Sequence, residues 1–123
     1  INVDVFPVNH GIESWGYRIN VGGRKTIVYT GDTRPIDNVV EYSRSADLLI
    51  HEATFTSDRS EEAFMQGHST AADAGKIAAK AKVKRLVLTH ISARYSNEQL
   101  LFYDAYRFHK NVVVANDYMV LII

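Results

Sequence analysis

The stretch YTGDTRP, residues 29–35, sets the interpretation of the whole chain. Lys25–Thr30, which overlaps its start, is rich in β-branched and aromatic side chains and so favours a strand. The glycine and proline that follow indicate a sharp loop. The strand therefore leads into a carboxylate, Asp32. This placement is typical of layered α/β proteins, where functional side chains gather at strand ends because loops there can vary without disturbing the core.

Two later strands end in side chains of the same kind. Asp47–Ile50 is a short, mostly apolar run that indicates a buried strand, and His51-Glu52 follow it directly. Arg85–Thr89 is a further predicted strand, and His90 follows it. Three strands that end in Asp, His-Glu and His form a pattern that core residues seldom produce by chance.

The remaining histidines are placed differently. His10 comes just after the first predicted strand, and His68 lies in the loop before a helix. Four of the five histidines therefore fall at strand ends or in loops. His109 ends a predicted helix, where a cation is favoured by the helix dipole, so we interpret it as structural.

Strands alternate with helices along the chain, which predicts one α/β domain or part of one. Gly22-Gly23 predicts a two-residue hairpin turn. Ser69-Thr70 predicts the cap of a helix that runs through Ala81. The other expected helical segments are Ile36–Ser45, a turn around Glu61–Met65, and Glu98–Phe108, and the other expected strands are Val3–Val8, Trp15–Val21, Val112–Ala115 and Tyr118–Ile122.

The composition limits the class of protein and the kind of metal site. The chain has 123 residues, of which 46% are hydrophobic and 23% charged, as in ordinary globular domains. The absence of cysteine excludes a disulfide scaffold, a thiolate zinc finger and a cysteine nucleophile. Any metal must therefore bind to His, Asp or Glu. No apolar run approaches the length of a membrane span.

The net charge of zero argues against a dedicated nucleic-acid-binding module, although it does not exclude an enzyme that acts on nucleic acid. The bases are unevenly spread. Six of them and no acid lie between Lys76 and Asn97. This run predicts either a solvated helix face or one edge of a polyanion site.

Imidazole nitrogens and carboxylate oxygens are the ligands that zinc accepts when thiolates are absent. A carboxylate such as Asp32 can bridge two ions, and two ions can activate water and stabilise the leaving oxygen of a phosphodiester. Taken singly, an aspartate after glycine is also typical of an ordinary turn, and a histidine can also be a hydrogen-bonded residue of the core. The convergence of several such residues at strand ends favours a metal site.

Five short blocks carry a resemblance that extends from about residue 5 to residue 96. These blocks are SWGYRI at 14–19, YTGDTRP at 29–35, HEATF at 51–55, GHST at 67–70 and LTHISARY at 88–95. Together they resemble the C-terminal half of ribonuclease Z, the tRNA 3′-processing endonuclease family of the metallo-β-lactamase superfamily. Gly-Asp-Thr alone marks only the superfamily, whereas the histidine-containing blocks are more specific.

The resemblance implies a site with two zinc ions. His10 would bind one zinc, Asp32 would bridge both, and His90 would bind the second. His68 would donate a proton to the leaving 3′ oxygen and would be held by Glu52.

Arg94 would be a weaker candidate for contact with a substrate phosphate, which suits the fork of donors on a guanidinium group. The role of His51 stays open between support of the site and a purely structural one.

The resemblance also implies the αββα sandwich, with residues 1–123 as the C-terminal part of a single metallo-β-lactamase-fold domain. The expected activity is that of a zinc-dependent endoribonuclease acting on precursor tRNA in the cytoplasm, with a homodimer as the expected assembly. Half of a sandwich should expose an apolar sheet face.

Two departures from the family pattern leave alternatives open. The His-x-His-x-Asp-His zinc motif is absent, and the first methionine is Met65, so we expect a truncated chain that binds zinc poorly and is inactive alone. Only 21 residues separate His10 from Asp32, too few for the family's long tRNA-gripping arm. An arm-less hydrolase of small phosphodiesters, sulfate esters or other esters therefore remains an alternative, as does an inactive fragment.

Overall fold

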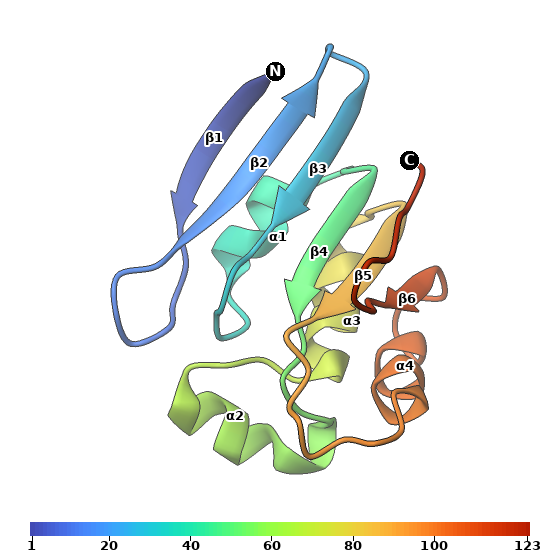
Figure 1. The fold of residues 1–123 in the computed structure, drawn as a ribbon. Coiled ribbons are helices and arrows are strands. Elements are labelled where there is room, and N and C mark those ends of the chain that lie inside the picture. The colour runs from blue at the N-terminus through green and yellow to red at the C-terminus, as the bar shows by residue number, and fades with distance from the viewer.

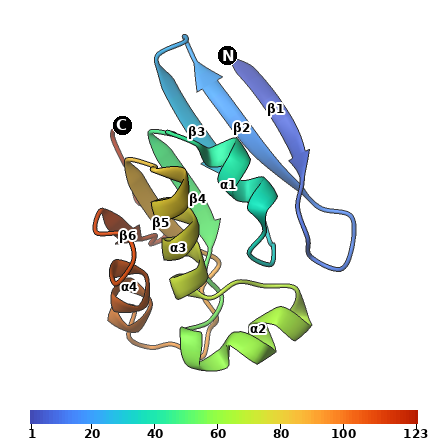
Figure 2. The same cartoon turned by 180° about the vertical axis from the view of Figure 1, so that it is seen from behind.

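The structure, a computed structural model, describes residues 1–123 as one six-stranded sheet with helices on one face (Figures 1 and 2). The strands follow one another across the sheet in chain order. They are β1 Asn2–Pro7, β2 Trp15–Val21, β3 Lys25–Tyr29, β4 Leu48–Glu52, β5 Arg85–Thr89 and β6 Val112–Val114. The helices are α1 Asp37–Ser43, α2 Ser60–Gln66, α3 Ala71–Ala81 and α4 Gln99–Tyr106, with a short 3-10 turn at Ser57–Arg59.

The direction of the strands determines where the polar residues gather. Strands β1, β2 and β3 form an antiparallel meander, whereas β3 to β6 are parallel and are joined by crossovers that contain helices. Because parallel strands present their carboxyl ends at one edge, the segments that follow β3, β4 and β5 meet there. This edge lies beside α2 in Figure 1.

The helix-covered face of the sheet forms the core. Alternate residues such as Val28, Leu49 and Leu86 point to this face and are fully buried. Helix α3 packs on it through alanines, among them Ala74 and Ala78, which are also fully buried. The small side chains allow the helix to approach the sheet closely, as the sequence predicts.

The opposite face of the sheet is apolar and partly exposed. Val3, Val5, Tyr17 and Tyr29 lie on this face and keep between 39% and 52% of their surface accessible. An exposed apolar sheet face is what half of an αββα sandwich predicts. Helices cover only the other face, so the structure corresponds to one sheet and one helix layer of that fold.

Several local predictions are confirmed. Gly22 and Gly23 both have positive φ, and the Arg24 amide donates to the Val21 carbonyl to close the turn. The hairpin is confirmed, but the prediction of a two-residue turn is wrong, because β3 begins only at Lys25 and the loop has three residues. Thr70 caps α3 in a reciprocal capping box with Asp73, at 3.1 and 2.9 Å.

The strand predicted at Tyr118–Ile122 is wrong. The chain after β6 turns and runs back as an unpaired segment, and Tyr118, Val120 and Ile122 are largely exposed. Its apolar, β-branched residues have strand propensity, but a strand also needs a neighbour with free hydrogen-bonding groups. Strand β4 also differs from prediction, since it includes His51-Glu52 rather than ending before them.

Asp104 of α4 joins this helix to two segments that approach the polar edge. Its carboxylate, 9% exposed, accepts from the amides of Ser57 at 3.0 Å and Ala72 at 2.9 Å. It also accepts from the Ser57 hydroxyl at 2.6 Å and from Arg107 at 2.9 Å. One buried carboxylate thus fixes the chain after β4 to the first turn of α3.

We predict that Asp104→Ala lowers the free energy of unfolding by about 2–4 kcal/mol, because two backbone amides lose their acceptor in a largely buried place. Urea denaturation of the chain measures this loss. Asp117→Ala removes an exposed carboxylate and should change stability by less than about 0.5 kcal/mol. Equal stability of the two variants would contradict the anchoring role of Asp104.

Candidate metal and catalytic site

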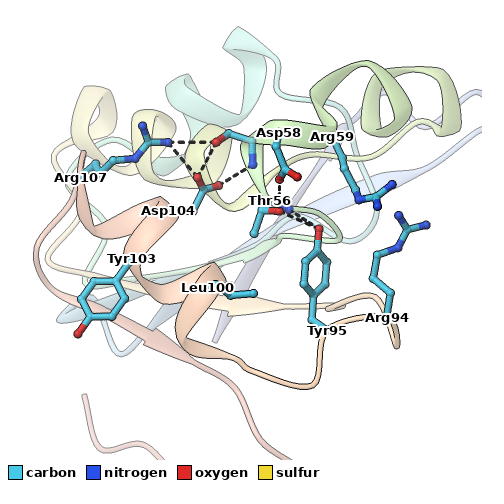
Figure 3. A pocket seen from close by; sticks show the side chains of 10 residues that line it. Thr56, Asp58, Arg59, Arg94, Tyr95, Leu100, Tyr103, Asp104 and Arg107 are labelled. Carbon is cyan, nitrogen blue, oxygen red and sulfur yellow. Dashed lines mark hydrogen bonds and ion pairs between the residues drawn. The ribbon is translucent and has the colours of Figure 1, made fainter.

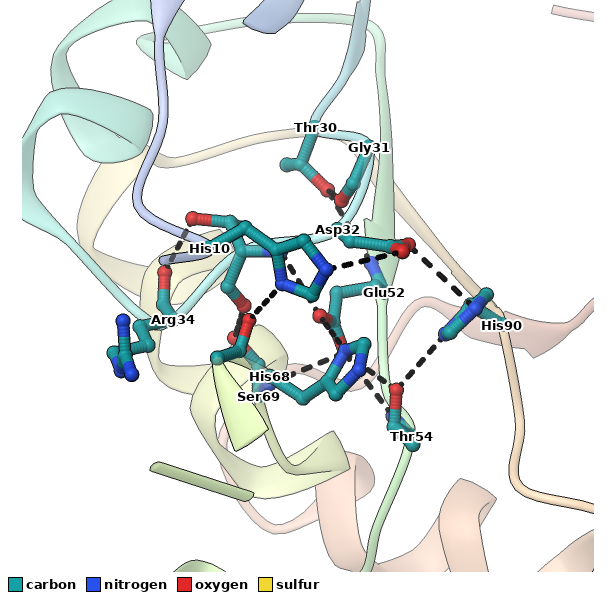
Figure 4. Close-up of polar contacts among 12 residues, drawn as sticks. His10, Thr30, Gly31, Asp32, Arg34, Glu52, Thr54, His68, Ser69 and His90 are labelled. Atoms are coloured by element: carbon teal, nitrogen blue, oxygen red, sulfur yellow. Dashed lines mark hydrogen bonds and ion pairs between the residues drawn. The ribbon is translucent and has the colours of Figure 1, made fainter. Parts of the chain in front are cut away.

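Five side chains from separate segments meet at the carboxyl edge of the sheet (Figure 4). Asp32 follows β3, Glu52 ends β4 and His90 follows β5. His10 comes from the β1–β2 loop, and His68 from the loop between α2 and α3. The His68 ring lies 4.8 Å from the His10 ring and 5.2 Å from the His90 ring, measured between centroids. The structure therefore brings together the five residues that the sequence predicted.

The two carboxylate oxygens of Asp32 face different histidines. Oδ2 lies 3.7 Å from His10 Nε2, and Oδ1 lies 3.6 Å from His90 Nε2. Two ligand atoms on a tetrahedral zinc are separated by roughly 3.4 Å, given bonds of about 2.0–2.1 Å. Asp32 thus has the geometry of a carboxylate that bridges two ions, one on each side.

Hydrogen bonds fix the tautomers of both histidines. His10 Nδ1 lies 2.6 Å from the Gly67 carbonyl, which can only accept, so Nδ1 carries the proton. The Thr54 hydroxyl donates to Glu52 at 2.8 Å and lies 3.0 Å from His90 Nδ1, so it accepts from that nitrogen. In the neutral form of each ring the lone pair is then on Nε2, which faces the Asp32 carboxylate. Acceptors that converge in this way fit a cation.

Gly67 makes the bond to His10 possible. Its φ of +79° is in the left-handed region, and a Cβ at this position would lie 2.5 Å from the His10 carbonyl oxygen. Any side chain would therefore push the two loops apart. In the sequence Gly67 is marked only as part of the GHST block, and its close approach to His10 arises from the tertiary fold.

Glu52 is buried and accepts five hydrogen bonds. Oε1 accepts from the Thr33 amide at 2.9 Å and lies 2.7 Å from His68 Nδ1. Oε2 accepts from the Thr54 hydroxyl and from the amides of Thr54 and Ser69, at 2.8, 3.3 and 3.1 Å. The sequence predicted the contact with His68 but missed Thr54, which links Glu52 to His90.

The arrangement around His68 allows two chemical roles. A histidine whose Nδ1–H donates to a carboxylate is held in one orientation and one tautomer, as required of a proton donor. The same pairing is typical of a zinc-binding histidine with its supporting carboxylate. Ligand atoms of His10, Asp32 and His68 lie within 4.8 Å of one another, and so do those of Glu52, His68 and His90.

His51 lies outside this group. Its side chain is fully buried, Nδ1 donates to the Glu52 carbonyl at 2.7 Å, and Nε2 has no partner. Burial is the main cause that lowers the pKa of His51 below its ordinary value of 6.5, which favours the neutral ring. His51 thus contacts the backbone of Glu52 and does not face Asp32 or the other histidines.

Arg94 and the other bases do not join the site or form one patch. Arg94 is paired with Glu62 at 2.9 Å and stacks over Phe55, with Cζ 5.0 Å from the ring centroid. Lys84 lies at the opposite edge of the sheet, before β5, and pairs with Asp47 at 2.8 Å. Arg94 and Lys84 therefore do not belong to one continuous polyanion edge between residues 76 and 97, and a phosphate contact of Arg94 stays a prediction.

His109 lies just after α4, where its amide donates to the Ala105 carbonyl at 3.1 Å, but its surroundings do not favour the charged ring expected at a helix end. Helix α4 ends at Tyr106, and burial lowers the pKa of His109, which disfavours the charged ring. Its Nε2 is buried without a partner.

Comparison with known proteins places this geometry in a family. The β-lactamase superfamily domain matches residues 1–91. Ribonuclease Z of Archaeoglobus fulgidus is 47% identical over 100 residues, which make up 80% of this chain and 32% of that protein. The chain therefore spans about a third of the length of the curated relatives it matches.

Two solved structures are also similar to this chain. Human tRNase Z, short form, has a TM-score of 0.78 and 34% identity, and the match covers 97% of this chain and 42% of that one. The metallo-β-lactamase fold protein YhfI from Bacillus subtilis has a TM-score of 0.83 and 29% identity, with coverage of 91% and 45%. No helix in the structure is long and apolar enough to cross a membrane.

The buried, neutral His51 predicts that stability depends on pH. Because its pKa is lowered in the folded state, the unfolded chain takes up the proton first. The stability contribution is complete above pH 6.5 and is lost as the pH falls, by at most about 1.4 kcal/mol per pH unit. Denaturation at several pH values measures the slope.

His51→Asn provides the test of this prediction, because an amide N–H can replace Nδ1–H without titrating. It should flatten the loss of stability at acid pH, and His109→Asn should flatten it less, because His109 is less buried. An unchanged slope in His51→Asn would show that His51 is not the group responsible.

Proposed function

The chain belongs to the β-lactamase superfamily, and from this premise we propose that it forms part of a zinc-dependent endoribonuclease that removes the 3′ trailer of precursor tRNA. The similarity to ribonuclease Z supports the reaction and the substrate. The observation that carries the proposal is the position of Asp32 between two histidine Nε2 atoms, beside the buried Glu52–His68 pair.

His10, Asp32 and His90 would hold the zinc ions. When bound, zinc would act as a Lewis acid that neutralises charge on phosphate oxygens and lowers the pKa of water. Three side chains are too few for two four-coordinate ions. We propose that the missing ligands come from the family's His-x-His-x-Asp-His segment, outside residues 1–123. The chain alone would then bind zinc weakly and be inactive.

His68 would act as the general acid. Water attacks phosphorus, the bond from phosphorus to the 3′ oxygen breaks, and His68 Nε2 gives its proton to that oxygen. The Glu52 carboxylate, 2.7 Å from Nδ1, orients the ring and stabilises its charged form. The products would be tRNA with a 3′ hydroxyl and a trailer with a 5′ phosphate.

One observation favours a second candidate function. The β2–β3 hairpin closes at Gly22-Gly23, so no arm extends between His10 and Asp32 to grip a tRNA. An arm-less hydrolase of small phosphodiesters or other esters would use the same ligands. The histidine-containing blocks favour the tRNA substrate, and we extend the proposal to a homodimer acting in the cytoplasm.

We predict that the whole protein, with zinc, cuts precursor tRNA once near the discriminator nucleotide, and that His68→Ala lowers the rate about 10²–10⁴-fold by removing the general acid. Mapping the cut and measuring single-turnover rates test this. His109→Asn, at a histidine away from the site, should retain the rate.

Measurement of the zinc content of His68→Ala distinguishes a proton-donor role of His68 from a metal-ligand role. A proton donor can be removed without loss of metal, whereas loss of a zinc ion from His68→Ala would make the residue a ligand. Absence of any cut, together with rapid hydrolysis of a small phosphodiester, would favour the arm-less hydrolase.

The bridging geometry predicts that Asp32→Asn weakens zinc binding of the whole protein at least about tenfold, because the amide nitrogen cannot accept a metal on its side. Equilibrium dialysis with zinc analysis measures both affinity and stoichiometry. Asp37→Asn, an exposed carboxylate in the first turn of α1, is the matched control. Unchanged stoichiometry and affinity in Asp32→Asn would argue against a shared ligand.

A further inference from the structure

A hollow of about 660 Å³ lies between α4, the start of α2 and the segment that follows β5 (Figure 3). Three guanidinium groups and two phenol rings line it, together with hydroxyl and carboxylate groups. The cations and rings are Arg59, Arg94, Arg107, Tyr95 and Tyr103. None of these five belongs to the group around Asp32, so the hollow needs an explanation of its own.

The hollow connects to the site along two short segments. Thr54 bonds His90 at the site, and Thr56, at most about 7 Å further along the chain, lines the hollow. Tyr95 bonds the Thr56 amide at 2.9 Å. Tyr95 also lines a second hollow of about 480 Å³ that contains His90. Tyr95 is therefore common to the hollow beside His90 and the hollow lined by the arginines.

The guanidinium groups keep donors free for a ligand. Arg59 and Arg94 share a single carboxylate, Glu62, at 3.0 and 2.9 Å. Each guanidinium has five N–H groups, so one carboxylate leaves most of them free. Exposed ion pairs of this kind contribute little stability, and a phosphate can compete for them.

The acids of the hollow are already occupied. Asp104 accepts from two backbone amides, a hydroxyl and Arg107, and Asp58 accepts from the Thr56 hydroxyl. The lining residues comprise three arginines and two aspartates, and Glu62, which pairs with two of these arginines, balances the remaining positive charge. Tyr103, next to Asp104 in α4, is 60% exposed, so its ring is accessible to a nucleic-acid base that could stack on it.

We infer that this hollow binds a nucleotide of an RNA strand outside the scissile bond. Arg59 and Arg107 contact its backbone phosphates, and Tyr103 stacks on its base. The combination of ring and guanidinium groups, in a space much larger than one phosphate, favours a nucleotide over a simple anion. The RNA class rests on the proposed function, whereas the residues rest on the geometry of the hollow.

The test measures RNA binding without catalysis. The 123-residue chain is titrated, in chelator, against a short fluorescent single-stranded RNA at about 50 and 200 mM salt, and anisotropy gives the affinity. Arg59→Ala and Arg107→Ala should each weaken binding several-fold and reduce the log–log salt slope by about 0.7. Tyr103→Ala should weaken binding about fivefold or more with little change in slope.

Two matched variants serve as controls. Arg44→Ala removes an exposed arginine that also pairs with a carboxylate, Glu41, but lies on α1 away from the hollow. Tyr106→Ala removes another exposed tyrosine of α4 that does not line the hollow. Both should retain the affinity of the unmodified chain. Arg107→Gln replaces Arg107→Ala if the latter unfolds.

Losses in the arginine and Tyr103 variants beyond those of the controls would support the inference. Failure of the unmodified chain to bind RNA, or equal affinity in all variants, would overturn it. So would competition by polyphosphate as strong as by RNA together with no effect of Tyr103→Ala, because the hollow would then be only a cationic patch. Since no cleavage is measured, RNA binding through this hollow can hold even if the whole protein does not cut precursor tRNA.

Discussion

The buried Glu52 carboxylate is the interaction on which the rest of the site depends. A charge removed from water is costly unless hydrogen bonds replace its hydration. Donors from the loop after β3, from the end of β4 and from the loop before α3 supply those bonds. Three segments that are distant in sequence are thereby held around the two carboxylate oxygens of Glu52. The bond from His68 Nδ1 to one of these oxygens orients the His68 ring.

The Asp104 carboxylate bonds to two of these segments, the chain after β4 and the chain that enters α3, away from the site. Residues 54–57 and 68–72 run next to each other, joined by the bridge between Phe55 and Thr70 and by the bond from the Ala71 amide to the Phe55 carbonyl. Glu52 fixes them at the site and Asp104 fixes them beneath the hollow. Site and hollow thus lie at opposite ends of one hydrogen-bonded pair of segments.

The polarity of the hydrogen bonds prepares the site for cations. His10 and His90 each give their Nδ1 proton to a neutral acceptor, and each turns a lone pair toward Asp32. A metal cation placed among these three groups would be attracted by the carboxylate and by both neutral ring nitrogens. The approach of Gly67 to His10 and the hydroxyl of Thr54 are therefore as important to the metal geometry as the ligands themselves.

The sequence by itself determined the order of strands and helices up to residue 114, the helix cap at Ser69-Thr70 and the five residues that converge at the sheet edge. These follow from local pattern and from the rule that parallel strands end at one edge. Only the tertiary structure decided that Tyr118–Ile122 is not a strand, that Arg94 pairs with Glu62, and that His51 is buried away from Asp32. Strand pairing, ion pairing and burial depend on which distant segment supplies a partner, and that information lies in the packing of the whole chain rather than in any stretch of its sequence.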